Sequence, residues 1–422
     1  MLSIDQLRDA VAGSAAAFRS RTRLQPAGGE GDKVFPPTYK DAVYATEKRR
    51  LPGFEDPVEC VLIDSVQSQA NRIEEALQDA VDEGRIKIPV VEVDFSDIPV
   101  VEPGTDVGDG LFEPIGRVTS LEAPHRVADA ILRDSELDGV TFRETTAGKQ
   151  IGVASLRNAT PLFEICPTAL LLGLWDSTGP KGGLGTKFQR ALVSEIIGIA
   201  ASYGTKTSSR IDPLAIRKDA ALIYETPDRG WTLSADEAAK KSKKPILKGK
   251  DGKPSEANHG NIVPSLSDTT RDGVPLAGGV TIAYAEQMTV ISLPALRRLQ
   301  FPVGGKVSVE TNRAGRTVVA ALGLCGAVLA TERGLDLRSR CLLWPTAPLS
   351  WELLDRPGTD SASFELDGDT VIALLNDAVQ QAKDAGLTWL DEPLKLKPAK
   401  KLVDLVRNSQ KLAILSGSEG GE

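Results

Sequence analysis

The sequence predicts an α+β fold, and three observations lead to this class. An apolar strand at Val58–Ile63 runs directly into a helix at Asp64–Val81, as at the start of a ferredoxin-like unit. Asp369–Ala385 has the apolar spacing of a helix and is bounded by a glycine on each side. Gly279–Leu293 alternates in patches like a strand and leads into a short helix at Pro294–Leu299. With 422 residues, of which 41% are hydrophobic, the chain can bury a sizeable core.

The other elements follow from the same patterns of apolar spacing and turn residues. Before the first strand-helix pair, the sequence predicts a helix to about Phe18, a strand at Arg19–Leu24 and a Gly/Pro-rich loop at Pro26–Tyr39. After it come strands at Ile88–Val93, Ala220–Glu225 and Leu337–Trp344, and helices at Arg126–Arg133 and Thr317–Thr331.

The most informative segment is Leu174–Arg190, which reads LWDSTGPKGGLGTKFQR. Its glycines follow an apolar run, Leu162–Leu174, and precede apolar residues at helical spacing. These apolar residues are Phe188, Leu192, Ile196, Ile199 and Ala200. We therefore expect a helix over Lys187–Tyr203, with Thr186 as its N-cap.

A glycine-rich turn that leads into a helix exposes backbone N–H groups and the positive end of the helix dipole, and both favour phosphate. The Gly-x-x-x-x-Gly-Lys-Ser/Thr pattern of nucleotide-binding loops is absent, as is Gly-x-Gly-x-x-Gly. The segment thus predicts a phosphate site without a nucleotidase motif, and a tight structural turn is the alternative.

A second polar segment lies on the helix at Asp64–Leu77. Val66, Ala70, Ile73 and Leu77 fall on one helical face, and polar side chains fill much of the rest. Amide and guanidinium groups of this kind hydrogen-bond sugars, base edges and phosphates. The alternative is an ordinary solvated face.

A long polar stretch, Thr226–Gly278, interrupts the apolar pattern. Within it, Lys240–Lys253 carries seven lysines against one aspartate. Structureless stretches of this size are usually functional or disordered. Because lysines release counterions from phosphates, the functional interpretation is a nucleic-acid arm, and the alternative is a mobile solvated loop.

The formal net charge of −8 argues against a protein that coats DNA through an overall positive charge.

Groups that usually perform catalysis are scarce. The two histidines, His125 and His259, lie in loop-like contexts, and metal or hydrolase motifs are absent. Asp176 precedes Ser-Thr-Gly and is interpreted as a turn-capping residue. We expect no enzymatic activity, no cofactor and no bound metal.

The expected location is the cytoplasm. The four cysteines are widely spaced and lie in apolar runs, as reduced structural thiols do. The N-terminal stretch lacks the basic start and apolar core of a signal peptide. No apolar run approaches the length needed to span a bilayer, so no membrane partner is expected.

Four segments in order carry a resemblance to a known family. They are TRLQPAGGEGDKVFPPTY (Thr22–Tyr39), DSVQSQANRIEEAL (Asp64–Leu77), WDSTGPKGGLGTKFQR (Trp175–Arg190) and SLPALRRLQFP (Ser292–Pro302). Together they resemble the CRISPR-associated RAMP proteins of the Cas-seven type, which form the backbone of type I-U (I-G) Cascade complexes. The resemblance extends from about Thr22 to about Trp389.

This resemblance implies a modified RRM-like palm with large insertions, including a thumb-like arm. The palm would occupy residues 16–225 plus 279–390, the arm residues 226–278, and a C-terminal helix with an acidic tail residues 391–422, all within a single RAMP backbone protein. Asp94–Pro124 is the rival insertion. The palm should not read bases by stacking as an ordinary RRM does, because aromatic residues are only 5% of the chain and no RNP-type aromatic pair is visible.

The implied function is antiviral defence, in which several head-to-tail copies of the protein bind one CRISPR RNA. Binding would not depend on the guide sequence, and the guide would be presented for pairing with target DNA. Further implied partners are the Cascade large subunit and a fused Cas-five/Cas-six-like subunit. The candidate RNA-binding residues are Arg21, Arg23, Gln67, Gln69, Asn71, Arg72, Lys181, Gly182, Gly183, Gly185, Thr186, Lys187, Arg190, Arg297 and Arg298.

Two other functions stay open from the sequence. One is a metal-dependent ribonuclease of the RAMP superfamily that uses Asp64 or Asp176. The other is an enzyme that binds a phosphate ligand with the glycine-rich loop at Gly182–Gly185.

Overall fold

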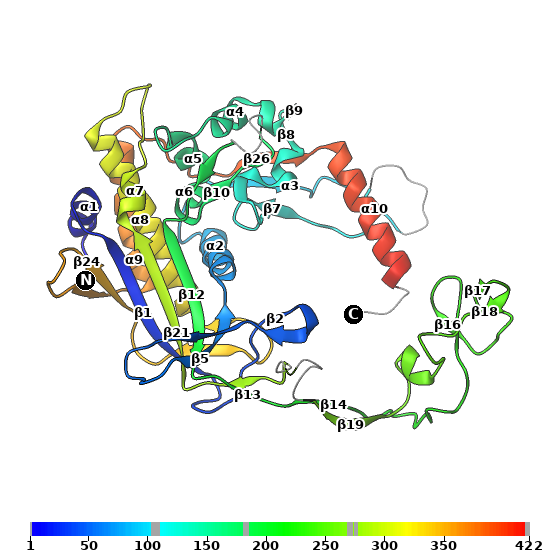
Figure 1. The fold of residues 1–422 in the computed structure, drawn as a ribbon. Coiled ribbons are helices and arrows are strands. Elements are labelled where there is room, and N and C mark those ends of the chain that lie inside the picture. Colours follow the sequence, from blue (N-terminus) through cyan, green and yellow to red (C-terminus); the bar gives the residue numbers. More distant parts are fainter. Residues whose placement is uncertain (1, 103–109, 180–184, 268–272, 274–276, 418–422) are drawn as a thin grey trace.

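The structure is a computed structural model that describes residues 2–102, 110–179, 185–267, 273 and 277–417. Its centre is an antiparallel sheet in the order β22-β23-β1-β21-β12-β5-β4, which β24 and β25 extend beside β1 (Figure 1). The strands are β1 (Ala17–Pro26), β4 (Thr46–Arg49), β5 (Val58–Asp64), β12 (Leu192–Ile199), β21 (Tyr284–Ser292), β22 (Leu335–Asp336), β23 (Leu342–Pro345), β24 (Ser350–Leu354) and β25 (Ala362–Glu365). This sheet is called the palm below.

Helices cover one face of the palm. They are α1 (Ile4–Ala12), α2 (Val66–Asp82), α7 (Leu293–Arg297), α8 (Val309–Glu332) and α9 (Gly368–Asp384). α8 packs against α1, α2 and α9, and its apolar side chains join theirs in the main hydrophobic core. The α+β prediction is confirmed, as are the helices at Asp64–Val81 and Asp369–Ala385, within one or two residues at each end.

The strand order explains how the palm is connected. The succession β1–α2–β12–β21–α8–β23, with sheet order β23-β1-β21-β12, is the β-α-β-β-α-β arrangement of ferredoxin-like folds. The sequence placed the first strand of this unit at Val58–Ile63. In the structure β1 holds that position, and β5 lies beyond β12 toward the sheet edge.

A second, smaller sheet lies beside the helical layer, in the order β7-β6-β26-β8-β9. Its strands are β6 (Val91–Asp94), β7 (Arg117–Thr119), β8 (Ser135–Leu137), β9 (Val140–Thr141) and β26 (Leu394–Pro398). Four short helices accompany this sheet. α3 (Ala130–Arg133) lies between β7 and β8 in the chain, and α4 (Thr146–Gly152), α5 (Thr160–Ile165) and α6 (Thr168–Leu172) follow β9. Of the described part of the rival insertion, residues 94–124, Asp94 and Arg117–Thr119 belong to this sheet, and the remaining residues lie outside its strands. The C-terminal segment joins it through β26 and leads into α10 (Lys400–Gly417), and residues 418–422 of the predicted acidic tail lie outside the described residues.

An arm projects from the palm between β12 and β21, at the lower right of Figure 1. Its base is the ribbon of β14 (Lys206–Arg210) and β19 (Ile262–Ser267), next to the pair β13 (Ser202–Tyr203) and β20 (Val280–Thr281). The distal part holds the hairpins β15 (Tyr224–Glu225) with β16 (Trp231–Thr232), and β17 (Lys240–Lys241) with β18 (Lys244–Pro245). The predicted insertion at 226–278 lies largely within this arm, which begins earlier, at β14.

The helix predicted over Lys187–Tyr203 is wrong. The chain there forms β11 (Lys187–Phe188), which pairs with β10 (Leu174–Trp175), and then β12 in the palm. β12 reads LVSEIIGI and is rich in β-branched residues, which pack well on a pleated sheet. Since no helix follows the glycine-rich loop, the predicted phosphate site at a helix N-terminus does not exist in this form.

The expectation that no apolar run reaches membrane-spanning length is also wrong. By length and composition alone, α8 could cross a membrane, with a mean hydropathy of 1.6 over its most apolar window. However, 83% of that window is buried inside the protein, as in the core helix of a water-soluble fold. Close packing explains its glycines: a Cβ on Gly326 would lie 2.7 Å from Ile73 Cγ2 of α2.

Candidate nucleic-acid interface

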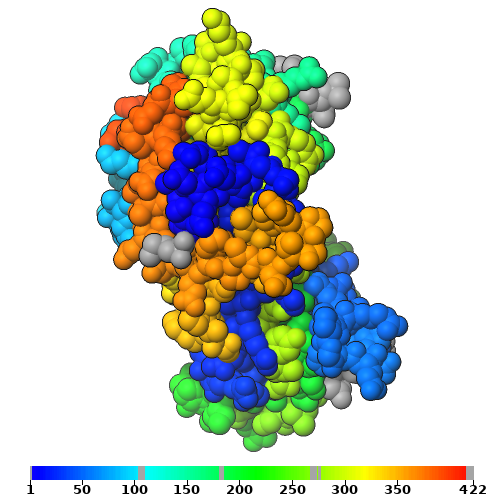
Figure 2. All heavy atoms as spheres, turned by 90° about the vertical axis from the view of Figure 1, so that its left-hand side faces the viewer, coloured from blue at the N-terminus to red at the C-terminus, as the bar shows by residue number. Residues whose placement is uncertain are grey.

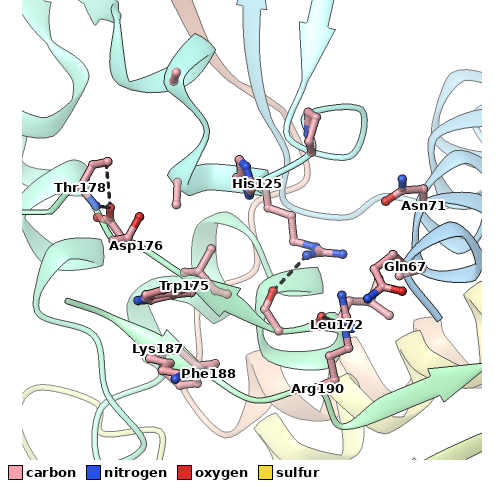
Figure 3. A pocket seen from close by; sticks show the side chains of 18 of the residues that line it. Gln67, Asn71, His125, Leu172, Trp175, Asp176, Thr178, Lys187, Phe188 and Arg190 are labelled. Atoms are coloured by element: carbon pink, nitrogen blue, oxygen red, sulfur yellow. Dashed lines mark hydrogen bonds between the residues drawn. The ribbon is translucent and has the colours of Figure 1, made fainter. Parts of the chain in front are cut away.

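A cleft of about 720 Å³ opens where three segments meet: the first turns of α2, residues 124–133, and the hairpin of β10 and β11. Figure 3 shows its lining residues. Gln67 and Asn71 enter from α2, His125 from the second segment, and Trp175, Lys187 and Arg190 from the hairpin and the residues after it (Figure 3). The cleft therefore joins two of the four segments that carry the family resemblance.

The start of α2 places the two amides. Ser65 caps the helix, because its side chain accepts a hydrogen bond of 3.2 Å from Ser68 N. Gln67 and Asn71 are one turn apart and exposed, so both amides face the cleft. The opposite face of α2 buries Ile73 and Leu77 in the main core, which fixes the orientation of the helix.

The hairpin places the two cations. Trp175 and Lys187 are cross-strand partners, and Lys187 Nζ lies 5.4 Å from the centre of the Trp175 ring. Phe188 is buried and anchors β11. Beyond β11, Arg190 is partly buried, and its Nε donates a hydrogen bond of 3.2 Å to the Leu172 carbonyl.

A buried ion pair forms the floor of the cleft. Arg126 donates to both carboxylate oxygens of Glu74, at 2.7 Å and 2.8 Å, and to the Gly173 carbonyl at 3.0 Å. Burial raises the pKa of Glu74 to about 7, although Arg126 pulls it down. Burial and the positive charge of Arg126 lower the pKa of Arg190. Arg126 thus occupies both oxygens of Glu74, whose charge acts on Arg190 without a hydrogen bond between them.

Asp176 has a structural role at the rim. Its Oδ1 accepts hydrogen bonds from Arg143 Nη2 at 2.8 Å and from Thr178 N at 3.2 Å. The prediction of a turn-capping aspartate is therefore confirmed. Because Arg143 compensates the negative charge of Asp176, this carboxylate does not cancel the positive charge that Lys187 and Arg190 bring to the cleft.

Two of the polar residues predicted on α2 point inward. Gln69 is buried and donates to Asp64 Oδ2 at 2.7 Å, while its Oε1 accepts from Ser194 and Gln287. Arg72 donates to Asp64 at 3.0 Å and to the Leu337 carbonyl at 2.6 Å. Both side chains connect α2 to the palm, and neither lines the cleft.

The predicted arginines of the first strand lie on the open face of the palm, away from the cleft. Arg21 is paired with Glu286 at 2.8 Å, and the guanidinium of Arg23 lies 4.3 Å from the centre of the Tyr284 ring. They alternate on one face, as predicted. Figure 2 views this side, where β1 (dark blue), β21 (yellow-green) and β12 (green) lie side by side below the orange segment of β24 and β25.

The other predicted residues lie outside the cleft or outside the described chain. Arg297 donates to the Ala15 carbonyl at 2.6 Å and braces the turn before β1, and Arg298 is exposed near its own helix. Thr186 is buried and donates to the Ile151 carbonyl at 3.0 Å, so it is not an N-cap. Gly185 is partly buried before β11. Lys181, Gly182 and Gly183 lie outside the described residues.

Sequence reasoning missed four residues of the cleft: His125, Arg126, Arg133 and Trp175. Trp175 gave the clearest indication, since it ends an apolar run immediately before polar turn residues. It is 57% exposed, unusual for so large an apolar side chain. The position of Arg126 depends on its contact with Glu74, 52 residues away, which no local pattern reveals.

Asp64 is poorly placed for the metal-dependent ribonuclease alternative. Its side chain is wholly buried and accepts hydrogen bonds from Gln69, Arg72 and Arg338. These donors occupy both carboxylate oxygens. In the described part of the chain, no group of three or more His, Cys, Asp or Glu side chains is arranged to hold a metal ion.

The structure is thus that of an α+β protein with a projecting arm and a cleft that amide and cationic side chains line. Residues 18–203 match a family model described as CRISPR-associated protein GSU0053. This match indicates a CRISPR-associated protein, and the resemblance to type I-U backbone subunits is consistent with it. It supports a role in CRISPR antiviral defence. No curated protein matches the sequence at a significant level.

Proposed function

We propose that this chain is the backbone subunit of a type I Cascade effector complex in the cytoplasm. Several copies bind side by side along one CRISPR RNA and present its bases to target DNA. Binding is independent of guide sequence, because contacts to phosphate and sugar carry no base information. The match of residues 18–203 to a CRISPR-associated family supports this setting.

The observation that carries the proposal is the convergence of Gln67, Asn71, Lys187 and Arg190 in one cleft. They come from two segments more than a hundred residues apart, and the cleft lies within the matched span. Amides and cations together suit a sugar-phosphate backbone. Asp176 is the one carboxylate among the described lining residues, and Arg143 neutralises it.

The arm supports contact between neighbouring copies. Its base ribbon exposes apolar side chains at Val263 and Leu266, which nothing in the described part of the chain covers. A protrusion that fits a different surface on the next copy gives a heterologous contact, and repeated contacts of this kind form an open filament. We propose the large subunit and a fused Cas-five/Cas-six-like subunit as the caps of this filament, and no catalytic activity for this chain.

Co-expression tests the proposal. The chain is produced with a CRISPR array and the neighbouring subunits, and the product is analysed by size exclusion and RNA extraction. We expect a large complex with RNA of one defined length. A monomer without RNA would overturn the backbone role.

A charge reversal tests the cleft within that complex. Lys187→Glu should reduce the RNA recovered, because it places a negative charge beside the sugar-phosphate backbone. Lys306→Glu, at an exposed turn away from the cleft, is the matched control. Equal RNA recovery from both variants would locate the interface elsewhere.

A further inference from the structure

We infer that the cleft holds one unpaired nucleotide of the bound strand, with its base stacked on Trp175 and its phosphate between Lys187 and Arg190. This inference rests on the proposed function and names the ligand of the same site. It departs from the sequence-based expectation of binding without stacking, because the aromatic surface belongs to the β10–β11 hairpin and not to the palm.

The exposure of Trp175 is the first observation. Its strand neighbour Leu174 is buried, whereas the indole lies at the edge of the cleft and remains 57% exposed. Exposed aromatic surface at a polar cleft is typical of a binding position. The ammonium of Lys187, 5.4 Å from the ring centre, adds a cation beside the stacking surface.

The uncompensated charge of Arg190 is the second observation. Glu74 is the carboxylate that acts on it, and Arg126 already occupies both oxygens of Glu74. The hydrogen bond from Arg190 to the Leu172 carbonyl pairs one N–H group, but this neutral acceptor does not compensate the positive charge. A partly buried cation beside a second guanidinium favours an anion, and a phosphodiester would supply one.

The distances agree with a single nucleotide. Lys187 lies directly across from Trp175, and Arg190 follows three residues later, roughly 10 Å along an extended chain. A base and its own phosphate can cover this span. The volume of about 720 Å³ falls within the range of small-ligand pockets and is too small for a duplex.

The cleft also tolerates any base. Stacking depends on the π-face that every base has, so its strength varies little with sequence. Gln67 and Asn71 carry both donors and acceptors and can rotate to meet different base edges or a 2′-hydroxyl. The site therefore suits a protein whose guide changes.

Binding of a labelled single-stranded RNA of mixed sequence to the purified protein tests the inference. Trp175→Leu should weaken binding about tenfold, and Trp175→Phe should restore most of the loss. Trp344→Leu removes an equally exposed tryptophan on β23, outside the cleft, and should leave binding unchanged. If Trp175→Leu binds like the parent, or if Trp344→Leu loses as much, the inference is wrong.

Competition experiments distinguish an RNA strand from a free nucleotide or a duplex as the ligand of the cleft. Unlabelled single-stranded RNA should displace the probe, whereas AMP, inorganic phosphate and double-stranded RNA should compete at least tenfold less well. Equal competition by AMP would assign the cleft to a free nucleotide, and equal competition by duplex would refute an unpaired one. If RNA of defined length co-purifies but Trp175→Leu has no effect, only this inference fails; if no RNA binds at all, the proposed function fails with it.

Discussion

Replacement of Arg126 by methionine should expose how the floor of the cleft is stabilised. The change removes three charge-assisted hydrogen bonds, two to Glu74 and one to the Gly173 carbonyl, while the buried stem is largely kept. The side chain of Glu74 is 3% exposed and would lose its counterion. Removal of one partner of a buried ion pair costs about 3–5 kcal/mol of the free energy of unfolding.

The pH dependence gives a sharper prediction. Burial raises the pKa of Glu74 in the folded parent to about 7, above its ordinary value. A carboxyl with a raised pKa stabilises the fold at low pH, and this contribution is lost as the pH rises through the folded value. Without Arg126 the pKa rises further, so the loss continues to higher pH, by at most about 1.4 kcal/mol per pH unit.

Urea denaturation at pH 6.5 and pH 9, followed by circular dichroism, measures both effects. The penalty of Arg126→Met should be larger at pH 9. In a Glu74→Gln background, the penalty of Arg126→Met should be equal at both pH values, since the buried carboxyl of residue 74 is no longer there to titrate. Arg133→Met is the matched control, because its partner Asp134 is solvent-accessible and such pairs contribute about 0–1 kcal/mol. A penalty below about 1 kcal/mol, or one equal at both pH values, would refute the reasoning.

Three further predictions concern the structure around the cleft. Asp64→Ala removes the buried carboxylate that the partly exposed Arg72 and Arg338 both contact, so the free energy of unfolding should fall by about 1.5–3 kcal/mol in urea titration; an unchanged midpoint would contradict this role of Asp64. Gly326→Ala should cost about 1–3 kcal/mol, because its Cβ would lie 2.7 Å from Ile73, whereas Gly152→Ala meets nothing within 4 Å and should not destabilise; equal melting temperatures would refute this. Ser65→Ala should cost about 1 kcal/mol through the lost cap of α2 and reduce RNA recovery with the complex; unaltered values would show that the cap does not order the helix start.

Long amphipathic helices could be predicted, because apolar residues that recur at helical spacing over many residues do not fit the two-residue period of a strand. α2 and α9 were found in this way. β12 was mistaken for a helix because both of its faces carry apolar residues: Ile196 faces a core beneath the palm, whereas Ile197 and Ile199 join a small cluster with Cys60. With no alternation left, the period of a short apolar run is ambiguous.

The candidate site was predicted in part. The sequence correctly selected the two segments that meet at the cleft, through their concentration of glycines, amides and cations. It could not distinguish Gln67 from Gln69, which lie two residues apart on a polar helix face. Gln69 turns inward because buried Asp64 and Ser194 need a partner, and those contacts exist only in the folded chain.

The insertion point of the arm has a consequence for how freely the protein can change. The chain leaves the palm after β12 and returns at β21, and these two strands are hydrogen-bonded neighbours. In terms of chain entropy, the arm therefore acts as one long surface loop between two adjacent strands. Doubling the length of a flexible loop adds only about 0.6 kcal/mol to the entropic cost of closing it. The length of the arm can therefore change, in evolution or by redesign, while the palm keeps its stability.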